Sequence, residues 1–140
     1  MRRRSVLAVA AAALVTAALL TPAGSATRRA PAVKLKAAGF GNILATRGRK
    51  ALYYWNVEKR DFKVRCTGRC AKTWPPLLVG SRAAVPKRVT GIRGTFGVIR
   101  RPDGRLQVTH NRLPLYTYAH EGPNQVLCDN VNGWFVVRLR

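Results

Sequence analysis

A stretch of 18 residues occurs twice in this chain, and this repeat constrains the fold more than any other feature. A shift of 63 positions lays residues 41–58, GNILATRGRKALYYWNVE, on residues 104–121, GRLQVTHNRLPLYTYAHE, without a gap. Each copy has two short β-prone segments around a turn, where Gly48 meets Asn111, two residue types that tolerate the left-handed backbone of tight turns. The repeat therefore predicts two hairpin-based β units packed as a pseudo-symmetric pair.

Each copy ends in the motif Tyr-x-aromatic-x-x-Glu. The motif residues are Tyr53, Trp55 and Glu58 in the first copy and Tyr116, Tyr118 and Glu121 in the second. Alternate residues of a strand share a face, and large aromatic residues on one face usually belong to the core. For the acids we expect structural pairing with the equivalent Arg49 and Arg112 across each hairpin. A ligand or metal role for the acids is the alternative.

The first 39 residues carry no repeat and are expected to lie outside the folded domain. Residues 1–26 combine the basic start MRRR, an apolar run over 6–20 and the small residues GSA, which predicts a secretory signal peptide cleaved after Ala26. The apolar run is short for a membrane span, although an uncleaved anchor is the alternative. No cysteine follows this run directly, so a lipid anchor is not expected. All charged residues among 27–39 are basic, and this segment is expected to form a flexible basic leader.

The predicted domain spans residues 40–140 and is all-β. It divides into repeat one (41–77), a connecting segment (78–103) and repeat two (104–140). The sequence Pro-Asp-Gly inside residues 100–105 predicts a hairpin turn. Helical periodicity is missing after the signal peptide, so we expect at most a short helical turn near the Cys-x-x-x-Cys loop.

Three cysteines follow the signal peptide: Cys66, Cys70 and Cys128. Export would place them in an oxidising compartment, which favours a disulfide, and a Cys66–Cys70 bridge is expected over a bridge from either to Cys128. The third cysteine is then free, or links two chains into a dimer. A zinc site from the cysteines with His110 or His120 meets the ligand count but lacks the paired spacing of zinc motifs.

The charge of the chain points to anionic partners. Removal of Arg2, Arg3 and Arg4 leaves 23 of the 26 basic residues against five acids, a net charge near +18. We expect docking to anionic envelope polymers, and to nucleic acid only non-specifically. The plain alternative is a solvated basic surface without a partner. The expected contact residues are Lys59, Arg60, Lys63, Arg65, Arg69 and Lys72 in the loop after the first motif, and Arg100, Arg101 and Arg105 in the second hairpin.

No catalytic constellation is evident in the sequence. A His120–Glu121 acid–base pair is disfavoured because adjacent strand residues point to opposite faces. The two histidines with many arginines suggest a secreted ribonuclease only weakly. Nucleophile elbows, phosphate-cradling glycine loops and cofactor motifs are also missing from the sequence.

The two Tyr-x-aromatic-x-x-Glu motifs and the cysteine loop resemble the "secreted repeat of unknown function" family. This family is also described as bacterial lipoproteins with a Tyr-x-(Phe/Trp/Tyr)-x-x-Asp motif. The match covers most of residues 40–139 and includes the string CTGRCAKTWPPL over 66–77 and WFVV over 134–137. The resemblance implies a small exported β-repeat protein of the cell envelope and names no reaction. Both motif acids here are Glu where the family has Asp, and the lipid-anchor cysteine is missing.

Together these observations predict an exported, non-catalytic β-repeat protein of the envelope or extracellular space that docks electrostatically to anionic polymers. The alternative is a secreted redox or metal-dependent protein that uses Cys66 and Cys70 with the motif acids Glu58 and Glu121.

Overall fold

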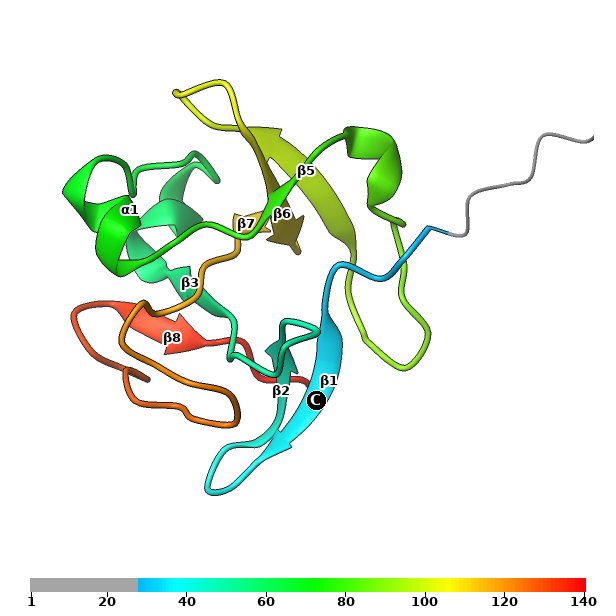
Figure 1. The fold of residues 1–140 in the computed structure, drawn as a ribbon, viewed down its shortest axis with the longest axis vertical. Helices are drawn as coiled ribbons and strands as arrows, with labels where there is room; N and C mark the ends of the chain where they lie inside the picture. The colour runs from blue at the N-terminus through cyan, green and yellow to red at the C-terminus, as the bar shows by residue number, and fades with distance from the viewer. Residues whose placement is uncertain (1–27) are drawn as a thin grey trace, which may run out of the picture.

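Eight short antiparallel strands make up most of the regular structure of residues 28–140, the part of the chain that the computed structural model describes (Figure 1). The strands are β1 (Val33–Ala37), β2 (Gly41–Ala45), β3 (Tyr53–Trp55), β4 (Leu78–Val79), β5 (Phe96–Arg100), β6 (Leu106–His110), β7 (Leu113–Pro114) and β8 (Trp134–Val136). The helical turns are η1 (Asn56–Arg60), α1 (Arg69–Thr73) and η2 (Arg82–Ala84). The predicted all-β class is confirmed, and α1 is the short helical turn expected near the cysteines. The predicted signal peptide lies outside the described residues.

The β1–β2 hairpin corrects the prediction for the start of the domain. β1 pairs along its whole length with β2, so the expected flexible leader over 27–39 is wrong from residue 33 onward. Leu35 and Ala37 are buried, whereas Lys34 and Lys36 between them are exposed. This alternation is the pattern of a strand with one wet face. The two lysines mark that face and are not a sign of disorder.

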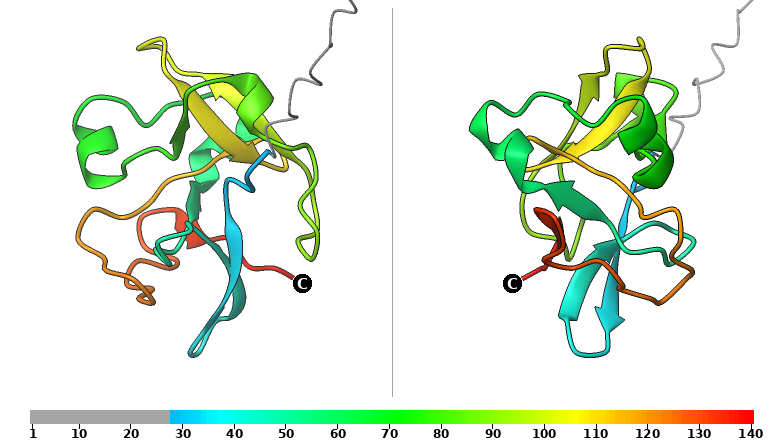
Figure 2. Two further views of the ribbon diagram at one scale, coloured as in Figure 1. Left: turned by 45° about the vertical axis from the view of Figure 1, so that its right-hand side comes forward. Right: turned by 90° about the vertical axis from the view of Figure 1, so that its left-hand side faces the viewer.

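The predicted hairpin at residues 100–105 is confirmed. β5 and β6 pair antiparallel, and the turn between them is closed by hydrogen bonds between the backbones of Arg101 and Arg105 and from Gly104 N to Arg101 O, both 2.9 Å. Gly104 takes the left-handed conformation, with φ of 84°. β4 and β7 also pair with β6, and this sheet and the β1–β2 hairpin lie at opposite ends of the molecule (Figure 2).

The two repeats are built into each other through exchanged strands. In repeat one, Leu44 N donates to Val137 O at 2.8 Å and Val137 N donates to Leu52 O at 2.9 Å. The segment that lies against this hairpin therefore comes from the end of repeat two (Figure 1). The same pattern recurs in repeat two, whose backbone bonds run from Val108 N to Leu77 O (2.8 Å) and from Leu77 N to Leu115 O (2.9 Å). The end of repeat one thus completes repeat two.

A pseudo-twofold axis passes between Tyr53 and Tyr116. Tyr53 N donates to Tyr116 O at 2.8 Å, and Tyr116 N donates to Tyr53 O at 3.0 Å. The predicted pseudo-symmetric pair is therefore present, with the motif tyrosines at its centre. Each tyrosine uses both its backbone N–H and its backbone C=O in this contact. The backbone hydrogen bonding of either repeat is therefore complete only with the other repeat in place.

The turns of the two repeats differ by one residue, which corrects the gapless alignment. Ala45 pairs with Ala51 across the first turn, and Thr109 pairs with Pro114 across the second. Five residues lie inside the first pair and four inside the second. The strands before the turns are therefore related by a shift of 64, and those after by 63. The left-handed residues include Arg49 and Arg112 in addition to Asn111, whereas Gly48 has no positive φ.

Aromatic side chains of both repeats form one cluster around the same axis. The rings of Trp74 and Trp134 stack with centroids 3.9 Å apart, and Tyr53 and Tyr116 each pack edge-on against the tryptophan of their own repeat, at 5.2 and 5.1 Å. The remaining motif aromatics extend the stack outward, with Tyr118 on Trp74 (4.8 Å) and Trp55 on Trp134 (5.4 Å). Tyr53 and Tyr116 are thus core residues, as their strand face predicts, whereas Trp55 and Tyr118 are partly buried and pack against this core.

Candidate functional site

The motif acids are buried and hydrogen bonded across the two repeats. The Tyr53 hydroxyl donates to Glu121 Oε1 at 2.6 Å, and the Tyr116 hydroxyl donates to Glu58 Oε1 at 2.7 Å. Glu58 is fully buried and Glu121 is 3% exposed. Each repeat therefore supplies the tyrosine for the other repeat's carboxyl group, and the motif forms a reciprocal pair of buried braces.

Backbone N–H groups complete the environment of Glu58, which lies in η1. Oε1 also accepts from Arg65 N at 2.8 Å and from Cys66 N at 3.3 Å, while Oε2 is buried without a partner in the described residues. Burial raises the pKa of Glu58, and these donors offset that rise only in part. The carboxyl thus ties the loop after η1 to the core and does not face solvent.

Glu121 occupies the equivalent position in repeat two. Its Oε1 accepts from Leu127 N at 2.6 Å in addition to Tyr53, and burial raises its pKa. The expected pairing of the motif acids with Arg49 and Arg112 is wrong. Arg49 donates to Asn124 Oδ1 at 2.6 Å, and the Arg112 guanidinium lies 4.0 Å from the ring centroid of Phe62. Burial also raises the pKa values of both motif tyrosines, so their hydroxyls stay protonated donors.

Arg101 is a buried structural residue, which corrects its expected place among the polymer contacts. It is 2% exposed and donates to Gln107 Oε1 at 2.5 Å and to Cys66 O at 2.8 Å. Asp103 lies 3.6 Å from its Nε. Its charge links the β5–β6 hairpin to the disulfide loop and cannot reach a polymer.

The Cys66–Cys70 disulfide is confirmed. It closes a short loop that leads into the first turn of α1. Cys66 is fully buried, and Cys128 is the free cysteine. A hydrogen bond to the Cys128 side chain raises the pKa of the Tyr118 hydroxyl, so these two side chains are neighbours. No group of three His, Cys, Asp or Glu side chains within residues 28–140 is arranged to hold a metal ion. The predicted link between chains through Cys128 stays a prediction.

The remaining residues of the expected polymer-binding loop lie on the surface. All six are exposed: Lys59, Arg60, Lys63, Arg65, Arg69 and Lys72. Arg65 pairs with Asp61, and in the second hairpin Arg105 pairs with Asp103 at 2.8 Å, which lowers the pKa of Asp103 to about 2. Arg100 is exposed and donates to Gly104 O at 2.9 Å.

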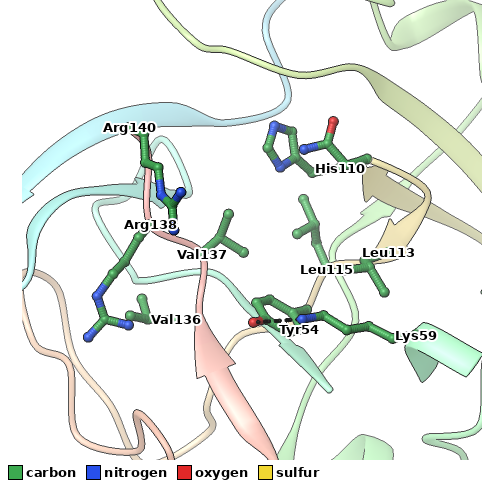
Figure 3. A pocket seen from close by; sticks show the side chains of 10 residues that line it. Tyr54, Lys59, His110, Leu113, Leu115, Val136, Val137, Arg138 and Arg140 are labelled. Atoms are coloured by element: carbon green, nitrogen blue, oxygen red, sulfur yellow. Dashed lines mark hydrogen bonds between the residues drawn. The ribbon is translucent and has the colours of Figure 1, made fainter. Parts of the chain in front are cut away.

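A cavity of about 340 Å³ lies between β3, η1, the β6–β7 turn and the end of the chain (Figure 3). Its polar lining consists of Tyr54, Lys59, His110, Asn111, Arg138 and Arg140, and its apolar lining of Leu113, Leu115, Val136 and Val137. A smaller hollow of about 220 Å³ shares several of these residues and adds Arg93. Sequence reasoning missed this site because its residues come from separate segments, and the arginines at positions 138 and 140 were the one available signal.

Comparison of the chain with protein-family models, with curated proteins and with solved structures gives no match. The family resemblance drawn from the motifs therefore stays a prediction. Across residues 28–140, no helix has the length and apolar character needed to cross a membrane.

Proposed function

We propose that this protein is an exported, non-catalytic module of the cell envelope or extracellular space that docks electrostatically to anionic polymers. The observation that carries this proposal is where the acidic side chains of the protein lie. Glu58 and Glu121 are buried, and each of the three aspartates forms an ion pair with arginine. Within residues 28–140 no acid is left on the surface without a cationic partner.

The cations far exceed what these pairs use. Four arginines contact an aspartate, which leaves 19 of the 23 basic residues without an acidic partner in the described part of the chain. A surface with this excess attracts polyanions over several ångströms and releases their counterions on contact. The exposed loop from Lys59 to Lys72 concentrates five of these cations and is held in place by the Glu58 brace and the disulfide.

The alternative, a redox or metal-dependent protein, receives less support from the geometry. A reactive disulfide must expose a sulfur to an attacking thiolate, whereas Cys66 is fully buried and Cys70 is partly buried. Glu58 and Glu121 point into separate buried braces with tyrosine partners. The predicted signal peptide and a disulfide that suits an oxidising compartment favour export.

Paired neutralisation tests whether the loop is the docking surface. For duplex DNA the slope of log affinity against log salt is about −0.9 for each phosphate neutralised. We expect the double variant Arg69→Gln with Lys72→Gln to make the slope shallower by up to about 2. The matched control, Lys34→Gln with Lys36→Gln on the exposed face of β1, removes the same charge and is expected to leave the slope unchanged. An equal loss from both pairs would contradict docking through the loop.

A further inference from the structure

We propose that the 340 Å³ cavity beside Tyr54 binds one phosphate ester group, with the phosphate held by Lys59 and Arg140 and the organic part of the ester on the apolar lining. This inference rests on the proposed function and deepens it, because it names the chemical unit of the anionic partner that is recognised individually. The other surface cations then supply general attraction, and the cavity supplies selection.

The polar groups of the cavity are arranged to donate hydrogen bonds. Lys59 Nζ donates to the Tyr54 hydroxyl oxygen at 3.3 Å, which leaves the Tyr54 hydroxyl hydrogen for a ligand. Asn111 Oδ1 accepts from Thr95 N at 3.0 Å, which leaves its NH₂ group as a donor. No Asp or Glu side chain lines the cavity. Such a lining complements a ligand that only accepts hydrogen bonds, which is the character of an ionised phosphate.

The positive charge is available from two sides. Figure 3 shows Lys59 and Arg140 on opposite sides of the cavity, with Leu115 and Val137 between them. Neither cation contacts an acid in the described part of the chain, whereas Arg138 is held at the rim by Asp129 Oδ2 at 2.8 Å. A guanidinium that donates two parallel bonds together with an ammonium point charge suits the several oxygens of a phosphate.

The apolar lining sets the second half of the specificity. The partly exposed Leu113 and Tyr54 ring and the edge of Val137 form the apolar surface that an inorganic ion cannot cover, and the buried Leu115 and Val136 pack behind them. Ligand sites commonly combine such a surface with a few placed polar groups in a volume of about 300–1,000 Å³. The ligand is therefore an ester with an organic body, and free phosphate should bind more weakly.

The test is a titration followed by amide NMR shifts at about 150 mM salt, with phenyl phosphate, hexyl phosphate, glycerol 3-phosphate, inorganic phosphate and phenol as probes. We expect the esters to bind at least about fivefold more tightly than inorganic phosphate or phenol, with shifts at Tyr54, Asn111 and Val137. Preference for hexyl phosphate would indicate a lipid source, and preference for glycerol 3-phosphate a polymer unit. Lys59→Gln and Arg140→Gln should each weaken ester binding about fivefold.

The control variants Lys34→Gln and Lys36→Gln remove the same charge from the exposed face of β1, outside the cavity lining, and should leave ester binding unchanged. Equal binding of all phosphates, or equal losses in cavity and control variants, would overturn the inference. Salt-dependent polymer binding without ester binding would refute the cavity site and leave the proposed function standing. Ester binding without polymer binding would do the reverse.

Discussion

Tyr53→Phe and Tyr116→Phe each remove one hydroxyl from the buried braces while the ring stays in the aromatic cluster. Both side chains are fully buried, so water cannot replace the lost donor without entering the core. Glu121 would keep only Leu127 N as a donor to Oε1, and Glu58 would keep Arg65 N and Cys66 N. The first substitution should therefore cost more than the second.

The expected magnitude follows from the partners. A hydrogen bond to an ionised group contributes about 1.5–3 kcal/mol to stability, and removing a partner from a buried acceptor adds a desolvation cost. We expect a loss of about 2–3 kcal/mol for Tyr53→Phe and about 1.5–2 kcal/mol for Tyr116→Phe. In a domain of this size such losses lower the melting temperature by about 4 °C or more per kcal/mol.

Urea unfolding followed by tryptophan fluorescence measures these losses, with the slope against urea checked for constancy. Tyr54→Phe is the matched control, because Tyr54 lies in the same strand and its hydroxyl only accepts from the exposed Lys59. We expect that control to change stability by less than about 0.5 kcal/mol. Equal effects of Tyr53→Phe and Tyr54→Phe would refute the buried braces.

Three further outcomes test the same account. Because their pKa values are raised, Glu58 and Glu121 bind protons more tightly in the folded protein than in the unfolded chain, so stability should increase as pH falls from neutral toward about 4.5. The free energy of unfolding measured at a series of pH values tests this, and a variant with both acids changed to Gln should lack the increase. Arg101→Met leaves two buried acceptors unpaired and should lower stability by about 2 kcal/mol or more, without changing the salt slope of polymer binding. A changed salt slope would instead show that Arg101 contacts the polymer. Reduction of Cys66–Cys70 should cost about 2 kcal/mol by the loop-entropy relation, measured by urea unfolding with and without reductant, and an unchanged midpoint would contradict that contribution.

The strands and the core aromatics were largely predictable because their signals are local. Alternation placed Tyr53 with Trp55 on one face, and the Pro-Asp-Gly sequence marked the β5–β6 turn. Alternation was also present in β1, but its charged residues obscured it, and the strand was wrongly assigned to a flexible leader. Charge on one face of a strand shows that the face is wet and does not show disorder.

The partners of the motif acids were not predictable from one hairpin. Pairing with Arg49 and Arg112 assumed that each repeat satisfies its own acid, whereas strand exchange brings Glu58 to Tyr116 over 58 positions of sequence. The cavity has the same origin, since Tyr54, Asn111 and Arg140 meet only after the repeats interlock. Local patterns specify elements, and contacts between repeats depend on how those elements pair.

A salt series of wild-type protein, starting at Thr27, binding to wall teichoic acid and to duplex DNA tests electrostatic docking most directly. We expect log affinity to fall linearly with log salt for both polymers, with several phosphates neutralised in each complex. Binding that is missing at physiological ionic strength, or that does not change with salt, would contradict the account and reduce the positive surface to a determinant of solubility.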